Sequence, residues 1–281
     1  MATLAYRLLN VFARGGRLTG NPLCVFEDGR SLDDTAMQDL ARQFNLSDTT
    51  FILPSERADA RVRIFTPAYE MPFAGHPTLG SAHVVRALRS LGDAIRLEMK
   101  AGIIPVEARG DRWTFQANAA LWREATESRS ELAEMFALAP GELADRPLWV
   151  NAGTEQLMVP LTSAAAVARA RPLPEAFARL RSTEGPGKAC VFADDGDASA
   201  SVTSRFFFPG VTAIIEDPAT GSACANLGGW FCALRPGESV ERVVSQGDRL
   251  GRPSTLRLSV KGGAIFVGGD VIELGRGVVE L

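Results

Sequence analysis

Two short segments of the chain place side chains that can move protons beside groups that can bind an anion. The first contains Gly75 and His76, and the second contains Asp217, Gly221 and Ser222. Histidine and carboxylate side chains commonly carry general acid–base catalysis, because their pKa values can be tuned toward neutral pH. A helix that starts with glycine and serine offers free N–H groups, a hydroxyl and the positive end of its dipole. These residue types predict proton transfer on a substrate with an anionic group, most simply a carboxylate.

Both segments belong to a pattern that occurs twice, about half of the 281 residues apart. The matching stretches are 63–67 with 205–209 and 77–82 with 218–223. Such a repeat predicts two similar halves that pack face to face around a cleft. In this alignment His76 and Asp217 each precede a repeated proline, so we expect them to face one another. Helices are expected to begin near Gly80 and Ser222.

Each of these residues also has an ordinary structural role. A lone histidine is usually a packed residue whose ring is satisfied by its neighbours. Asp217 could simply cap a helix, and glycine and serine are common in turns and caps. The repetition of the pattern favours the functional interpretation over these roles.

Composition excludes several classes of function. An apolar fraction of 46% and a charged fraction of 22% are typical of a globular protein with room for two domains. The net charge of −3, without a basic run, argues against nucleic acid as a partner. We find no secretory signal, no apolar stretch of about 20 residues and no CxxC pair, which predicts a cytoplasmic protein with reduced thiols and no membrane partner. Only two histidines are present, which excludes a His-rich metal site, and a carboxylate-only site, though possible, has no clustered acidic signature, so we expect no metal.

The pattern of apolar residues predicts the same plan in both halves. The expected helices are 35–44, 80–92, 129–137, 174–180 and 222–234, and the expected strands include 5–12, 22–27, 49–54, 60–65, 201–208, 240–246, 255–260, 264–268, 271–274 and 278–281. The helices near 80–92 and 222–234 are apolar on most faces, which predicts burial within a strongly curved sheet. We expect one domain over 1–125, completed by about 270–281, and a second over 126–269.

Several segments together resemble the PhzF-like family of phenazine-biosynthesis isomerases, in order along the whole chain. They are GNP at 20–22, NLSDTTF at 45–51, FTP at 65–67, PFAGHP at 72–77, EDPATGSA at 216–223, QG at 246–247 and GRPS at 251–254. The resemblance implies an α+β fold of two pseudo-symmetric domains like those of diaminopimelate epimerase. In each domain a curved sheet or barrel would wrap around a central helix, with the active site in the cleft between the domains.

The family resemblance also implies an activity and its residues. The family's named reaction is isomerisation of trans-2,3-dihydro-3-hydroxyanthranilate without a cofactor, and family members commonly form homodimers. Carried over by position, the catalytic residues are Asp48, His76 and Asp217. The residues expected to bind the carboxylate-bearing substrate are Ser47, Gly75, Gly221 and Ser222.

Asp48 departs from the family, which has a glutamate at this position. Aspartate keeps the charge but shortens the reach by about 1.5 Å, one C–C bond. Three possibilities stay open: a reshaped isomerase pocket, a different substrate, or a weakened enzyme. A non-catalytic protein that binds small acids, and an epimerase without thiols, are the competing functions. A two-thiol racemase is disfavoured, because Ala74 and Asp217 stand where its thiols would lie.

Overall fold

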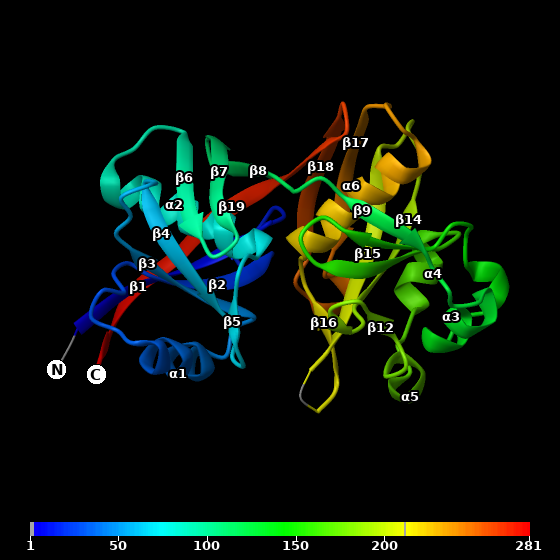
Figure 1. The fold of residues 1–281 in the computed structure, drawn as a ribbon, viewed down its shortest axis with the longest axis horizontal. Helices are drawn as coiled ribbons and strands as arrows, with labels where there is room; N and C mark the ends of the chain where they lie inside the picture. The colour runs from blue at the N-terminus through cyan, green and yellow to red at the C-terminus, as the bar shows by residue number, and fades with distance from the viewer. Residues whose placement is uncertain (1–2, 211) are drawn as a thin grey trace. The chain divides into compact units, whose positions relative to one another are not determined.

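The computed structural model describes residues 3–210 and 212–281, which divide into two compact units (Figure 1). Unit 1 contains Met1–Gln116 and Gly268–Leu281, and unit 2 contains Ala117–Val267. Strand β19 (Ala264–Glu280) starts in unit 2 and continues into unit 1. Among the described residues, the helices are too short or too polar to cross a membrane.

Unit 1 is a closed ring of strands around one helix. Its elements are β1 (Thr3–Val11), β2 (Asn21–Phe26), α1 (Asp34–Phe44), β3 (Asp48–Leu53), β4 (Ala60–Phe65), β5 (Glu70–Met71), α2 (Gly75–Arg89), β6 (Ala94–Met99), β7 (Gly102–Arg109) and β8 (Arg112–Gln116). The pairing runs β1–β2–β3–β4–β6–β7–β8–β19 and closes on β1, with β2–β3 and β4–β6 parallel. Helix α2 contacts β1, β2, β3, β4, β6, β7 and β8, so the strands surround it (Figure 1).

Helix α1 covers the outside of this ring and sets the entry to β3. The Asp33 side chain accepts from the N–H of Ala36 and caps the helix start. The buried residues of α1 pack with Phe26 and Phe51 of β2 and β3, whose rings are stacked with centroids 4.9 Å apart. Full burial of such a ring contributes roughly 1.5–3 kcal/mol. Asn45 ends the helix in the left-handed conformation, and the chain then enters β3 at Asp48.

Unit 2 also wraps strands around a central helix. Its elements are β9 (Leu121–Glu124), α3 (Arg129–Met135), η1 (Pro140–Glu142), β10 (Leu148–Asn151), β11 (Glu155–Pro160), α4 (Ala164–Arg169), α5 (Pro174–Phe177), β12 (Arg181–Ser182), β13 (Gly185–Pro186), β14 (Ala189–Asp194), β15 (Ser201–Pro209), β16 (Ile214–Asp217), α6 (Gly221–Leu234), β17 (Val240–Gln246), η2 (Asp248–Leu250) and β18 (Ser254–Lys261). The pairing runs β9–β10–β11–β14–β15–β17–β18. Helix α6 packs on β9, β10, β11, β17 and β18, while α3, α4 and α5 contribute to a separate apolar cluster with β11 and β14.

The prediction that the first central helix begins near Gly80 is wrong, because α2 begins at Gly75. Pro77 lies in the first turn, where its missing N–H breaks no helical hydrogen bond. Gly80 is a packing residue: a Cβ there would lie 2.4 Å from Leu23 Cδ2. The Ser81 hydroxyl donates to Thr50 Oγ1 and is buried. Neither residue is therefore at a helix start, where it could bind an anion.

The corrected helix start changes which residues correspond between the units. Helix α6 begins at Gly221, within one residue of the prediction. Gly75 therefore corresponds to Gly221, and His76 corresponds to Ser222. Asp217 corresponds to Met71, since it follows Glu216 as Met71 follows Glu70, and each glutamate pairs with a phenylalanine of the preceding strand. The expectation that His76 and Asp217 are equivalent is wrong.

The last part of the chain also differs from the prediction. The sequence predicts separate strands over 264–268, 271–274 and 278–281, but β19 runs unbroken to Glu280. Its glycines allow close contact and do not interrupt the strand. A Cβ at Gly277 would lie 2.5 Å from the Tyr6 hydroxyl oxygen, and one at Gly268 would lie 2.5 Å from Thr114 Oγ1.

Candidate active site

Asp48 and His76 form a buried pair in unit 1. Asp48 is the first residue of β3, and His76 is the second residue of α2. Their side chains are only 9% and 7% exposed, and His76 Nδ1 lies 3.6 Å from Asp48 Oδ2. The structure thus brings together two of the three predicted catalytic residues.

Burial keeps the His76 imidazole neutral. Desolvation lowers its pKa to about 3, and a hydrogen bond with the Pro22 carbonyl only partly opposes this shift. The contact with Asp48 is therefore a neutral ring beside a carboxyl group and not an ion pair at neutral pH. His76 Nε2 is buried and has no hydrogen-bond partner within the described residues. Such an atom costs about 1–3 kcal/mol, which favours a role with a ligand.

Ser47 and Gly75 complete the group that we call the acid–base cluster: Ser47, Asp48, Gly75 and His76. The Ser47 hydroxyl donates to Asn21 Oδ1 at 3.0 Å. Gly75 is the first residue of α2, and Ala74 before it supplies no side-chain cap. The first-turn N–H groups therefore have no side-chain acceptor at the cap and can serve a ligand.

The donor cluster in unit 2 consists of Asp217, Thr220, Gly221 and Ser222. The Thr220 hydroxyl donates to Asp217 Oδ2 at 2.5 Å. Gln246 braces this turn, since its Nε2 donates to the Asp217 carbonyl at 2.8 Å and to Thr220 Oγ1 at 2.9 Å. Because the Thr220 side chain does not cap α6, the N–H groups around Gly221 and Ser222 are again uncapped by a side chain.

Two further polar residues of unit 2 were not found by sequence reasoning. Gln156 on β11 donates from Nε2 to Ser222 Oγ at 2.9 Å. Lys188 directly precedes Ala189, which pairs with Phe207 as Thr49 pairs with Phe65. Lys188 therefore occupies the position of Asp48. Burial lowers the pKa of this lysine, and Glu184 opposes the shift.

Tyr69 is a third residue that the sequence did not single out. It lies just before β5, and its side chain is 55% exposed. Partial burial raises the pKa of its phenol, and the charge of Asp48 raises it further. Tyr69 therefore lies near the acid–base cluster, with an exposed ring that a ligand can reach.

The cysteines are poorly suited to nucleophilic chemistry. Cys24, Cys190 and Cys224 are buried, and Cys232 is only partly so. Cys190 and Cys224 thus lie in the core, whereas Cys232 lies nearer the surface. Burial raises the pKa of Cys190 to about 12, and the pKa values of the other thiols are also raised. Within the described residues, no group of three His, Cys, Asp or Glu side chains is arranged to hold a metal ion.

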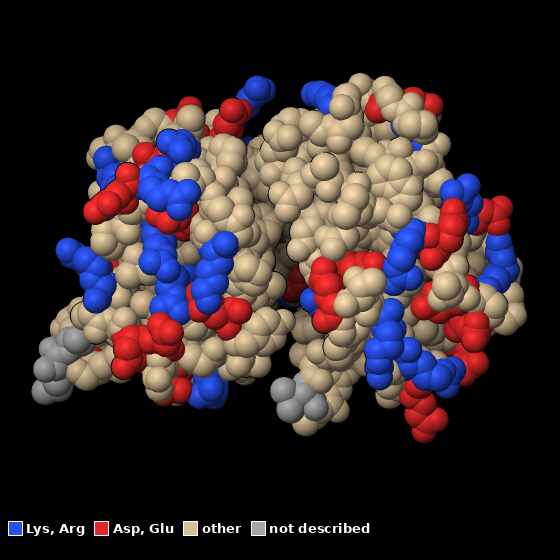
Figure 2. All heavy atoms as spheres, viewed as in Figure 1, with Lys and Arg blue, Asp and Glu red and all other residues tan. Residues whose placement is uncertain are grey.

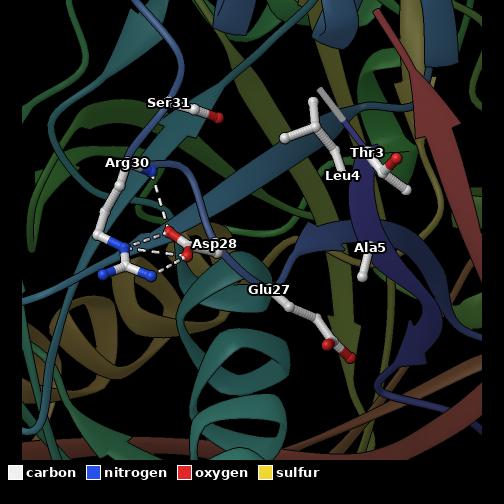
Figure 3. Close-up of a pocket in the computed structure, with 7 residues that line it drawn as sticks. All are labelled: Thr3, Leu4, Ala5, Glu27, Asp28, Arg30 and Ser31. Atoms are coloured by element: carbon white, nitrogen blue, oxygen red, sulfur yellow. Dashed lines mark hydrogen bonds and ion pairs between the residues drawn. The ribbon is translucent and has the colours of Figure 1, made fainter. Parts of the chain in front are cut away.

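A pocket of about 520 Å³ in unit 1 has no comparable chemistry (Figure 3). It is lined by Thr3, Leu4, Ala5, Glu27, Asp28, Arg30 and Ser31. Arg30 and Asp28 pair with each other at 2.6 Å, and both are largely exposed. The space-filling view shows acidic and basic side chains interspersed over the visible face of each unit (Figure 2). The acid–base and donor clusters are therefore stronger candidates for the functional site than this pocket is.

Comparisons with known proteins agree with this architecture. A profile described as phenazine biosynthesis-like protein (PhzC–PhzF) matches residues 9–271. An uncharacterized isomerase of Pasteurella multocida is 35% identical, over 97% of this chain and 93% of that protein. The trans-2,3-dihydro-3-hydroxyanthranilate isomerase of Pseudomonas aeruginosa is 33% identical, over 92% and 90%. The crystal structure of a PhzF-family phenazine biosynthesis protein from Bacillus anthracis has a TM-score of 0.87 at 23% identity and covers 100% of both chains.

The profile and the two relatives span most of the chain, and the solved structure shares its barrel-rich fold with few helices. The chain belongs to the phenazine biosynthesis-like (PhzC–PhzF) family and is an isomerase.

Proposed function

We propose that the protein is a cofactor-independent isomerase that moves a proton between carbons of a small carboxylate-bearing substrate. The reaction would be of the trans-2,3-dihydro-3-hydroxyanthranilate isomerase type. The observation that carries this proposal is the Asp48–His76 pair, 3.6 Å apart, with a buried His76 Nε2 that has no partner in the described part of the chain. A carboxylate beside a neutral imidazole can both accept and return a proton near neutral pH.

Asp48 would carry the proton. The carboxylate removes a proton from one carbon, and the C–H electron pair becomes part of a shifted double bond. The carboxyl proton exchanges with solvent, and the carboxyl group then delivers one proton to another carbon of the substrate. No atom is gained or lost, no oxidation occurs, and the carboxylate is regenerated. The neutral ring of His76 would relay a proton during this shift or hold the substrate's amino and hydroxyl groups.

The donor cluster would hold the substrate. Ser222 and the first-turn N–H groups of α2 and α6 favour an anionic oxygen, because each is a donor at the positive end of a helix. Asp217 would accept from an amino or hydroxyl group of the substrate. We further propose that the two units are copies of one plan and that both clusters serve one substrate in a shared cleft. The matching helix starts support this part of the proposal.

Aspartate at position 48 would act with a shorter reach than the glutamate expected for the family. A positioning error near 1 Å can cost about a hundredfold in rate. The substrate is therefore expected to lie closer to β3 than it would beside a glutamate. A panel that includes smaller amino and hydroxy acids is the appropriate set of test compounds.

The test is deuterium uptake in D₂O, followed by NMR, with trans-2,3-dihydro-3-hydroxyanthranilate and that panel. Wild type should incorporate deuterium and shift the double bond. Asp48→Asn should lose about 10²–10⁴-fold in rate, the usual contribution of a general acid–base group. Asp39→Asn is the matched control, because Asp39 is an exposed carboxylate on α1 that pairs with exposed Arg42.

Equal uptake by Asp48→Asn and wild type would overturn the assignment of Asp48. Inversion of a stereocentre without a double-bond shift would identify an epimerase. Thermal stabilisation by one compound without any uptake would identify a binding protein.

A further inference from the structure

A relay of buried amides in unit 2 ends at Ser222. The backbone N–H of Ala152 donates to Asn226 Oδ1 at 2.8 Å. Asn226 Nδ2 donates to the Thr154 carbonyl at 3.0 Å and to Gln156 Oε1 at 2.9 Å. Gln156 Nε2 then donates to Ser222 Oγ at 2.9 Å. Gln156 and Asn226 are each only 1% exposed, so water does not compete for these bonds.

The backbone fixes the direction of every bond in this relay. A backbone N–H can only donate and a carbonyl can only accept, so Ala152 and Thr154 leave one orientation for the Asn226 amide. With Asn226 donating, Gln156 must present Oε1 to it and Nε2 to Ser222. The assignment of oxygen and nitrogen in the two amides thus follows from fixed neighbours.

The consequence for Ser222 is that its oxygen accepts from Gln156, and its own proton must go elsewhere. Serine in a helix often donates to the carbonyl four residues earlier, but Ser222 makes no such bond within residues 3–210 and 212–281. Ser222 is the second residue of α6. The N–H groups of this first turn have no partner within the helix, and the side chain of the N-cap residue Thr220 does not accept from them. The hydroxyl proton and these N–H groups are all donors.

We propose that Gln156 and Asn226 are positioning residues that hold Ser222 as an obligatory hydrogen-bond donor to the substrate's carboxylate. The identity of the ligand, a substrate carboxylate, rests on the proposed function. The relay adds the direction of the hydrogen bond, from Ser222 to that carboxylate. A carboxylate only accepts, so a serine whose proton was directed toward Gln156 would turn its own lone pairs toward the anion. The relay prevents that arrangement.

The decisive variant is Gln156→Glu, which has nearly the same shape and the opposite polarity. An ionised carboxylate at position 156 can only accept hydrogen bonds, from Asn226 and from Ser222. The Ser222 hydroxyl would then donate to this carboxylate and could no longer donate to the substrate. We expect KM to rise about ten- to a hundredfold, the usual worth of a hydrogen bond to a charged group, with a much smaller change in kcat.

The control is Gln156→Met, which removes the donor but leaves the Ser222 proton available. We expect KM to rise only a few fold in this variant, as for loss of one neutral hydrogen bond. A role in packing alone predicts the reverse order, because glutamate preserves the volume and the bond from Asn226. In Gln156→Glu, lowering the pH should return KM toward the wild-type value at the same pH, since a protonated carboxyl group can donate again.

Neutron diffraction on deuterium-exchanged wild-type crystals tests the polarity without any substrate. We expect deuterons on Gln156 Nε2 directed at Ser222 Oγ, and the Ser222 deuteron directed away from Gln156. A Ser222 deuteron directed at Gln156 would overturn the inference. So would a wild-type KM in Gln156→Glu. Absence of any proton transfer by wild type would instead count against the proposed function and leave the neutron result to decide the polarity.

Discussion

The starts of α2 and α6 have the same backbone arrangement and different chemistry. Each helix begins with glycine, follows a proline by a short turn and has no side-chain cap. At the second position α2 has His76, a group that titrates, whereas α6 has Ser222, a group that only hydrogen-bonds. Under the proposed function, one scaffold would serve acid–base chemistry in one unit and hydrogen-bond donation in the other.

The neighbours of each helix start differ in a matching way. Asp48 lies beside His76, while its counterpart Lys188 lies before β14. Gly80 in α2 allows Leu23 to pack closely, whereas Asn226 occupies the corresponding position of α6 and bonds to Gln156. Apolar packing supports the titrating pair, and a polar relay supports the donor.

What the units share is a clamp that holds the strand before each helix. Arg63 bonds to both oxygens of Glu70 at 2.8 and 2.7 Å, and Arg205 bonds to both oxygens of Glu216 at 2.9 and 2.7 Å. Each guanidinium also lies over a phenylalanine ring, at 5.0 Å in unit 1 and 4.9 Å in unit 2. Such bidentate pairs fix geometry as well as charge. The shared residues thus form the scaffold, and the proposed chemistry rests on the residues that differ.

The largest expected difference between the clusters is kinetic. His76→Gln should lower kcat about 10²–10⁴-fold, because it removes a proton-handling group. Ser222→Ala should act mainly on KM, by about ten- to a hundredfold, because it removes a donor to a charged group. Steady-state kinetics with the compound that exchanges deuterium measure both. Equal effects on kcat would show that the division between the clusters is wrong.

A second difference concerns stability in acid. The pKa of His76 falls from near 6.5 in the unfolded chain to about 3 in the fold, so the unfolded chain binds the extra proton between these values. Stability should therefore fall as the pH is lowered from about 6.5, by up to about 1.4 kcal/mol per pH unit from this group. Urea unfolding should be measured between about pH 6.5 and 4.5, because the carboxylates whose pKa values are lowered titrate mainly below this range.

The matched variants for this measurement are His76→Gln and His83→Gln. Burial also lowers the pKa of His83, so this residue contributes in the same direction. His76→Gln should flatten the slope by more than His83→Gln does. An unchanged slope in His76→Gln would contradict the assignment of a buried neutral imidazole.

The clamps should respond alike in both units. Glu70→Gln and Glu216→Gln each leave a largely buried guanidinium with a weaker partner, and each should lower the free energy of unfolding by about 2 kcal/mol. Urea unfolding of the two variants measures this. Because Glu70 also binds Lys100, its variant should be slightly the more destabilised. A loss in one unit only would show that the scaffold is not shared.

The smallest effect is expected at Gly80. Gly80→Ala places a Cβ 2.4 Å from Leu23 Cδ2 and 3.1 Å from Val11 Cγ2. The cost of overpacking, about 1–3 kcal/mol, is partly offset by the higher helix propensity of alanine, about 1 kcal/mol. A net loss near 1 kcal/mol in thermal or urea unfolding is expected. Gly92→Ala is the control, since nothing lies within 4 Å of its added Cβ, and a larger loss there would contradict the packing role of Gly80.

Short-range sequence patterns predicted the local plan of the chain and drew attention to Asp48 and His76. Helix patterning located the two central helices, although their starts were not equally well placed. The motifs around Asp48 and His76 singled out residues that the fold places 3.6 Å apart. Local patterns succeed here because strand and helix periodicities, and strong motifs, are properties of short segments.

The correspondence between residues of the two units depends on the folded structure. Matching prolines and glycines aligned 77–82 with 218–223, but a helix begins where hydrogen bonding and packing allow, and Pro77 is tolerated in a first turn. Gln156 is distant from Ser222 in the sequence, and Asn226 is a buried residue of the same helix as Ser222. No local sequence pattern marks either residue as functional. Their roles follow from strand register and from buried polar groups that must find partners, and both conditions are met only once the chain has folded.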